Sequence, residues 1–134
     1  MTPIILDSVE PPKGVVVSLH GLGADGHDFK DIFTKPQFNK IRFILPHAPY
    51  QPVTINQGYE MRAWYDLYDL SLEKDEDESG MKRSSLNIQK LIEEQISLGI
   101  PSEKIIISGF SQGAAMSFYL GLKYHQKLGG IAAL

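Results

Sequence analysis

A Gly-x-Ser-x-Gly pattern at 109–113 constrains the fold of this chain more than any other stretch. It lies between a continuous β-branched run at 104–108 and a helix-forming run at 112–125. In that position the pattern predicts a sharp strand-to-helix turn that exposes the serine hydroxyl beside the first amides of the helix. A side chain on either glycine would collide where strand and helix pass closest. Ser111 is therefore the candidate nucleophile, and a serine that merely caps the helix is the alternative.

Short apolar runs alternate with segments of helical periodicity along the rest of the chain. We expect strands at 4–6, 15–19, 41–45 and 104–108, helices at 28–33, 81–96 and 112–125, and loops at 46–52 and over most of 53–80. The run at 104–108 is typical of a strand buried on both faces. The alternation predicts an α/β fold with a mostly parallel sheet, helices on both faces, and active groups at the carboxyl ends of the strands.

A glycine-rich segment at 20–26 follows the predicted strand at 15–19. Parallel strands end at the same edge of a sheet, so this loop and the turn that carries Ser111 should converge. Attack of a serine on a carbonyl carbon needs two backbone N–H groups aimed at the oxyanion, one from the residue after the nucleophile and one from such a loop. Leu22 and Gln112 are the candidate donors. A tight surface turn without this role is the alternative.

The same loop satisfies the dinucleotide-binding pattern G-x-G-x-x-G at 21–26. That type of site needs an acidic residue about 20 positions further on, where it binds the ribose. The corresponding segment at 46–49 is Pro-His-Ala-Pro and holds no acid. A nicotinamide cofactor is therefore not expected.

Two other polar patterns resemble metal sites in part. The segment 75–80 begins like a calcium loop, but its twelfth position is Leu86, where a bidentate glutamate should stand. The usual ligand spacings are also not met by the polar side chains around the glycine-rich segment, His20, Asp25, His27 and Asp28. The sequence therefore predicts no metal.

Composition excludes several classes of partner. The chain has 134 residues, of which 43% are apolar, enough for one globular domain. Its net charge of −3 argues against a nucleic-acid partner or an anionic membrane surface. There is no cysteine for disulfides, and no apolar run approaches the ~18 residues of a membrane span. We expect a cytoplasmic protein with no stable membrane insertion.

Trp64 and Tyr65 form an aromatic pair inside the long segment 53–80. Such a pair can wall an acyl pocket, although buried aromatic residues more often fill a core. With Gly21 of the glycine-rich segment, Trp64 is the candidate for substrate binding.

Five ordered motifs resemble the acyl-protein thioesterase and phospholipase/carboxylesterase family of α/β-hydrolases. They are His-Gly-Leu-Gly at 20–23, Pro-His-Ala-Pro at 46–49, Trp-Tyr-Asp at 64–66, Glu-Asp-Glu-Ser-Gly at 76–80 and Gly-Phe-Ser-Gln-Gly at 109–113. The resemblance implies an α/β-hydrolase fold and hydrolysis of acyl esters or thioesters through an acyl-enzyme on Ser111. It also implies an oxyanion hole from the amides of Leu22 and Gln112, and no cofactor.

A serine nucleophile needs an adjacent base, and the base needs an orienting acid. In α/β-hydrolases both follow the serine in the chain, yet residues 112–134 hold no acid and one histidine, His125. A helix over 112–125 would put His125 about 20 Å from the turn. His20 and His47 lie at the correct edge of the predicted sheet and are the candidates for a substitute base.

The segment 129–134 is typical of the start of a buried strand. We therefore expect residues 1–134 to be the front portion of a single α/β-hydrolase domain that is C-terminally incomplete, with the triad aspartate and histidine beyond residue 134. An unpaired strand edge favours self-association or pairing with a complementing fragment. The alternative is a catalytically inactive acyl-binding or interaction module that lacks the base.

Overall fold

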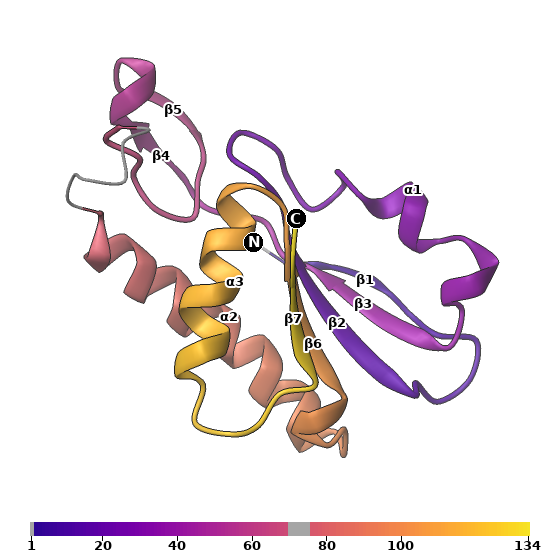
Figure 1. The fold of residues 1–134 in the computed structure, drawn as a ribbon. Helices are drawn as coiled ribbons and strands as arrows, with labels where there is room; N and C mark the ends of the chain where they lie inside the picture. Colours follow the sequence, from indigo (N-terminus) through magenta and orange to yellow (C-terminus); the bar gives the residue numbers. More distant parts are fainter. Residues whose placement is uncertain (1, 70–75) are drawn as a thin grey trace.

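A five-stranded sheet forms the centre of the computed structural model, which describes residues 2–69 and 76–134 (Figure 1). β1 runs antiparallel to β3, and the other pairings in this sheet are parallel. The prediction of a mostly parallel sheet is therefore confirmed. In spatial order the strands are β1 (Ile4–Leu6), β3 (Ile41–Leu45), β2 (Gly14–Leu19), β6 (Ile105–Gly109) and β7 (Gly130–Ala133).

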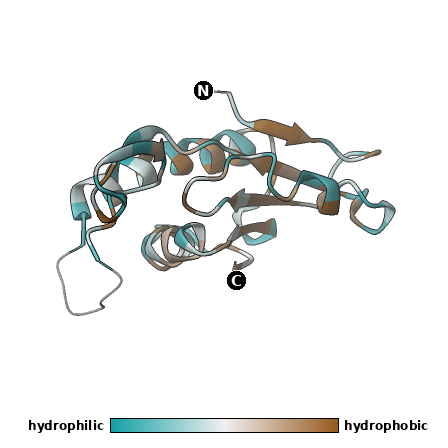
Figure 2. Cartoon of the chain, turned by 90° about the horizontal axis from the view of Figure 1, so that it is seen from above, coloured by the Kyte–Doolittle hydropathy of each residue, from teal (hydrophilic) through white to brown (hydrophobic). Residues whose placement is uncertain are grey.

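The neighbouring strands β2 and β6 supply much of the core, because alternate side chains of each strand share one face of the sheet. These side chains are almost completely buried: Val15, Val17, Leu19, Ile105 and Ile107. Full burial of one such side chain contributes roughly 1.5–3 kcal/mol relative to its exposure. Figure 2 shows the hydrophobic colour concentrated along the strands.

Two long helices cover this face of the sheet, and a short helix lies on the other (Figure 1). α2 spans Glu78–Ser97 and α3 spans Gln112–Lys123. Their contributions to the core cluster include Ile88, Ile92, Met116 and Leu120. On the opposite face α1 (Lys30–Phe33) packs through Phe33, whose ring stacks on Phe43 of β3 with 4.3 Å between centroids. The prediction of helices on both faces is confirmed.

The second face of the sheet is covered less completely than the first. Ile106 of β6 is 36% exposed, although both of its neighbours in the strand are fully buried. The prediction that this strand is buried on both faces is wrong at Ile106. The reason is that the described aromatic packing on this side centres on β3, where Phe33 and Phe38 contact Phe43.

A separate two-stranded sheet occupies part of the region predicted as loop. β4 (Tyr50–Val53) pairs antiparallel with β5 (Tyr59–Arg62), across a turn that contains Gly58 at φ 78°. The prediction of loop through 46–52 and most of 53–80 is wrong over both strands. Most of the hairpin side chains are not buried and β4 contains a proline, so neither strand shows the alternation by which strands are recognised.

Helix boundaries differ by a few residues from those expected. α2 begins at Glu78, earlier than predicted, because the Asp77 carboxylate caps it and accepts a hydrogen bond from Gly80 N at 3.1 Å. α3 ends at Lys123, two residues before the predicted end. The acidic run at 73–78 and the calcium-type pattern that overlaps it lie partly outside the described residues. Among the described helices, none has both the length and the apolarity to cross a membrane.

The carboxyl ends of three parallel strands meet at one edge of the main sheet. β2 lies between β3 and β6 and runs parallel to both, so the segments that follow these strands leave from the same edge. They are the glycine loop (20–26) after β2, the segment 46–49 after β3, and the elbow (109–113) at the end of β6. This is the edge at which the sequence predicts the active groups.

Candidate active site

The elbow turns the chain from β6 into α3 within a few residues. Ser111 stands at its apex with φ 56° and ψ −115°, a backbone conformation that costs of order 1–3 kcal/mol for a residue with a side chain. Backbone hydrogen bonds hold the turn: Phe110 N donates to Leu19 O at 3.1 Å, and Gly113 N to Phe110 O at 2.9 Å. Ser111 is exposed and its side chain makes no capping hydrogen bond, so the structure does not support the helix-cap alternative.

The two glycines of the elbow are required by contact between backbone atoms. A Cβ on Gly109 would lie 2.1 Å from Gly113 O, and a Cβ on Gly113 would lie 2.1 Å from Leu19 O. Neither neighbour is the end of a flexible side chain, so neither can move aside cheaply. The steric reason predicted for the glycine spacing is confirmed.

Gly21 brings the glycine loop against the elbow. A Cβ at this position would lie 3.3 Å from Phe110 Cδ1 and 3.5 Å from Ser111 Cβ. The loop then turns back through Gly23, which has φ 78° and whose amide donates to Arg62 O at 2.9 Å. The predicted convergence of the two loops is therefore confirmed.

The two predicted oxyanion donors lie on either side of this junction. Gln112 directly follows Ser111 and is the first residue of α3, and Leu22 lies in the glycine loop. Within the described residues neither of these backbone amides donates a hydrogen bond, whereas the next amides, of Gly113 and Gly23, are both engaged. The Leu22 and Gln112 N–H groups thus remain available to an oxygen atom of a ligand.

The Gln112 side chain ties the elbow helix to the aromatic pair. Its Oε1 accepts from Trp64 N and its Nε2 donates to Tyr65 O, both at 2.9 Å. The Trp64 indole Nε1 donates in turn to His20 O at 2.8 Å. One buried amide and one indole therefore link α3, the aromatic pair and the glycine loop.

Trp64 itself lies in the core, with 3% of its surface exposed. It also lines a cavity of about 340 Å³ between the segment 46–49 and α2, and Ser111 is not among the residues that line this cavity. In the structure Trp64 therefore connects α3 to the glycine loop through its hydrogen bonds. Its role in substrate binding stays a prediction.

His20 is buried, and both of its ring nitrogens are engaged. Ala48 N donates to Nε2 at 2.9 Å, so the proton resides on Nδ1, which donates to Gly21 O at 2.8 Å. Burial lowers the pKa of His20 and outweighs the Gly21 carbonyl, which acts in the opposite direction. A neutral ring with both nitrogens bonded to backbone holds the loop in place and is not poised to take a serine proton.

Among the described residues, the remaining histidines form no hydrogen bond with Ser111. His27 Nδ1 lies 3.2 Å from Asp25 Oδ1, and His125 follows the far end of α3, which at ~1.5 Å per residue is about 18 Å from Ser111. His47 uses Nδ1 to accept from Gly26 N at 3.0 Å. Over residues 2–69 and 76–134, no hydrogen bond joins the Ser111 hydroxyl to a base.

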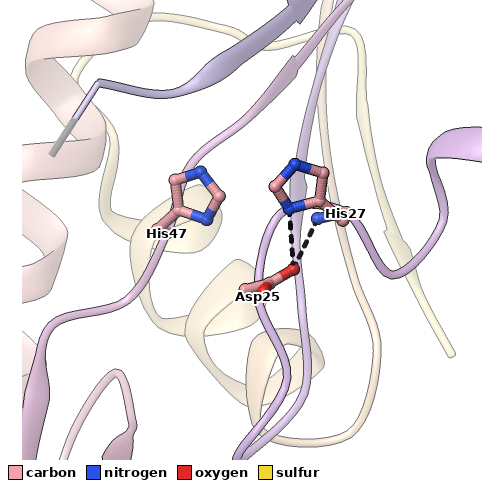
Figure 3. Close-up of side chains that lie close together, drawn as sticks. All are labelled: Asp25, His27 and His47. Carbon is pink, nitrogen blue, oxygen red and sulfur yellow. Dashed lines mark hydrogen bonds and ion pairs between the residues drawn. The ribbon is translucent and has the colours of Figure 1, made fainter.

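Asp25, His27 and His47 lie close together at the outer end of the glycine loop (Figure 3). One potential ligand atom from each falls within 4.8 Å of the other two. The sequence places Asp25 and His27 near His20 and Asp28, whereas in the structure the third member of the cluster is His47. These donor types suit a transition metal, but the Gly26 amide already occupies the Nδ1 lone pair of His47. The absence of a metal stays a prediction.

Sequence reasoning missed the residues that fasten the glycine loop to its surroundings. Arg62 Nη1 donates to Ala48 O at 2.7 Å, and the Arg62 carbonyl accepts from Gly23. His47 accepts from the loop at Gly26. The available signal was the Pro-His-Ala-Pro motif, which follows a strand that ends at the active edge.

Comparison with known proteins supports the same family. Residues 2–134 match the Phospholipase/Carboxylesterase family. Acyl-protein thioesterase 1 of Schizosaccharomyces pombe is 42% identical over 132 residues, which cover 98% of this chain and 59% of the relative. Acyl-protein thioesterase 1 of Neurospora crassa is 38% identical over 141 residues, covering 98% and 58%. The chain therefore spans about three fifths of the length of these curated relatives.

Solved structures show the same fold. SOBER1 of Arabidopsis thaliana superimposes with a TM-score of 0.80 at 31% identity, over 88% of this chain and 59% of that chain. Acyl-protein thioesterase 2 of Zea mays gives a TM-score of 0.77 at 31% identity, over 89% and 50%. The resemblance inferred from the five motifs and the predicted α/β-hydrolase fold are both confirmed. This chain belongs to the phospholipase/carboxylesterase family of α/β-hydrolases.

Proposed function

We propose that this chain provides the nucleophile and the oxyanion hole of a serine hydrolase that cleaves carboxylic ester or thioester bonds of acyl substrates. The observation that carries the proposal is the exposed Ser111, held at positive φ beside the unengaged amides of Leu22 and Gln112. The names of the relatives, which are acyl-protein thioesterases, support an acyl substrate.

In this mechanism a general base removes the hydroxyl proton of Ser111 while Oγ bonds to the acyl carbonyl carbon. The carbonyl oxygen gains negative charge and accepts hydrogen bonds from Leu22 N and Gln112 N. Collapse of the tetrahedral intermediate breaks the bond to the alcohol or thiol, which leaves with the proton. Water, activated by the same base, then releases the carboxylic acid and restores Ser111.

The base and its acid partner are proposed to come from residues that follow position 134. The described histidines are bonded elsewhere or distant from Ser111, and α/β-hydrolases place both groups after the nucleophile. The match covers only 59% and 58% of the two relatives' own length. Gly21 is proposed to border the bound acyl group, because a Cβ at this position would lie 3.5 Å from Ser111 Cβ.

Covalent labelling tests the proposal directly. The product of the complete reading frame is treated with an activated alkyl phosphonate, which reacts with a serine that has a base and an oxyanion hole. We expect stoichiometric labelling that Ser111→Ala abolishes and that the exposed control Ser97→Ala retains. A folded protein that fails to label would favour the catalytically inactive acyl-binding module.

The class of substrate is tested by comparing an ester and a thioester that carry the same acyl chain. Esters and thioesters of the same acyl chain should both be hydrolysed, and Ser111→Ala should remove both activities together. Activity that survives in Ser111→Ala would assign the chemistry to another group.

A cytoplasmic location and self-association through β7 stay predictions from the sequence.

A further inference from the structure

A hydrogen bond to His47 anchors the outer end of the glycine loop. Gly26 N donates to His47 Nδ1 at 3.0 Å, across 21 positions of sequence and from one strand end to the next. The inner end is anchored separately, through His20 and its bond from Ala48 N. Leu22, the proposed oxyanion donor, lies between the two anchors.

The bond to His47 depends on a close approach that only glycine permits at position 26. A Cβ on Gly26 would lie 2.5 Å from Leu45 O and 3.1 Å from His47 Cε1. The bare backbone therefore presses against the end of β3, and its amide points directly at the ring. This contact explains why position 26, the third glycine of the G-x-G-x-x-G pattern, is glycine without any role in nucleotide binding.

The same bond requires a neutral His47 ring. The Gly26 amide can only donate, so Nδ1 must offer a lone pair, and protonation would set two donors against each other. The titratable groups of the described residues around the ring are Arg62 of β5, Asp25 and His27 of the glycine loop, and His20. Burial lowers the pKa of His47, Arg62 lowers it further, and Asp25 acts in the opposite direction.

We propose that His47 is a positioning residue, which as a neutral ring holds the glycine loop, and with it the Leu22 amide, in place beside Ser111. Protonation of His47 releases the outer end of the loop. The catalytic consequence rests on the proposed function, whereas the anchoring does not. Anchoring is complete above the ordinary histidine pKa of about 6.5 and is lost as the pH falls through the lowered pKa of His47.

Amide hydrogen exchange tests the anchoring without any need for activity. In the product of the complete reading frame, the protection factor of Gly26 is measured by NMR for the wild type and three variants. His47→Ala should lower it about 10-fold, because the donor loses its acceptor. His47→Asn, which offers a carbonyl oxygen that does not titrate, should restore most of the protection. His27→Asn is the matched control and should leave it unchanged.

The pH dependence of Gly26 protection distinguishes a hydrogen bond to the neutral His47 ring from a simple packing role of that ring. Wild-type Gly26 protection should fall on acidification below about pH 6.5, while the His47→Asn protein should keep a flat profile over the same range. A wild-type profile as flat as that of His47→Asn would overturn the proposal. So would unchanged protection in His47→Ala.

Hydrolysis then connects the anchor to catalysis. His47→Ala should lower kcat about 10-fold with a smaller change in KM, because the Leu22 contact strengthens only as charge develops on the oxyanion. His47→Asn should recover most of the loss. If the wild type shows no hydrolysis but His47→Ala still loses protection, the proposed function fails and the anchoring stands. If activity is present and His47→Ala leaves it and the protection intact, the anchoring fails alone.

Discussion

The elbow and the glycine loop meet at Ser111, but different interactions hold them in place. The elbow is fixed by backbone atoms in contact, as the 2.1 Å that would separate a Cβ on Gly113 from Leu19 O shows. The glycine loop is fixed by side chains, through hydrogen bonds to His20 and His47. A Cβ is excluded at both glycines of the elbow and at Gly26 of the loop, but the loop depends in addition on the two histidine side chains.

The supports of both loops lie far away along the chain. Gly113 of the elbow packs against Leu19 of β2, and the Gln112 side chain accepts a hydrogen bond from Trp64 N, 48 positions away. The glycine loop needs Ala48, which is 28 positions from His20, and Trp64, which is 44 positions from it. The glycine spacing marks the elbow in the sequence, whereas no local pattern marks the contacts of the loop with β3 and the aromatic pair.

The largest effect is expected from adding volume to the elbow. Gly113→Ala should destabilise the protein by about 3 kcal/mol or more, because the new methyl group would overlap the backbone oxygen of Leu19, which is fixed in β2. The urea midpoint measures this loss. Gly130→Ala is the control, because no atom lies within 4 Å of a Cβ there, and it should change stability by less than ~0.5 kcal/mol. A tolerated Gly113→Ala would contradict the steric account of the elbow.

A smaller loss is expected from cutting the link between elbow and loop. Gln112→Ala removes two buried hydrogen bonds and leaves Trp64 N and Tyr65 O without partners. We expect about 2 kcal/mol of destabilisation, measured by chemical unfolding. A buried polar group left without a partner costs more free energy than the net contribution of the hydrogen bond that was removed. Gln89→Ala, which removes a single part-buried hydrogen bond to Ser85 Oγ, is the comparison and should cost far less. Equal losses from the two would argue against the link.

The inner anchor of the glycine loop predicts a pH dependence. Burial lowers the pKa of His20 in the folded protein, so the stability that the neutral ring contributes is present above the ordinary pKa of about 6.5 and is lost as the pH falls. His20→Asn should cost about 1 kcal/mol near neutral pH. It should also lose less stability than the wild type on acidification. Parallel stability curves of the two proteins would show that His20 is not held neutral.

The smallest effect is expected at the exposed tip of the glycine loop. Asp25 Oδ1 accepts from His27 N at 2.8 Å, and 45% of the Asp25 side chain is exposed. Asp25→Asn keeps an acceptor and removes a solvated charge, so unfolding free energy should change by less than ~0.5 kcal/mol. A loss as large as that of Gln112→Ala would mean that the tip, and not the buried anchors, holds the loop.

Much of the fold followed from local pattern because its signals are local. The run at 104–108 and the glycines of the elbow led to β6, α3 and an exposed Ser111, since periodicity and steric limits act over a few residues. The hairpin of β4 and β5 carries no such signal, because its residues are mostly not buried and one is proline. Strand pairing without a buried face leaves little trace in the sequence.

By itself the sequence determined the family, the nucleophile candidate and the edge of the sheet where it stands. Only the tertiary structure showed which groups His20, His47 and Trp64 bond. Each of these side chains could serve as base, ligand or pocket wall according to its chemistry, and each forms a hydrogen bond with the backbone in or beside the glycine loop. The physical reason is that a hydrogen bond between residues 21 to 44 positions apart depends on the packing of several strands, which no local pattern encodes.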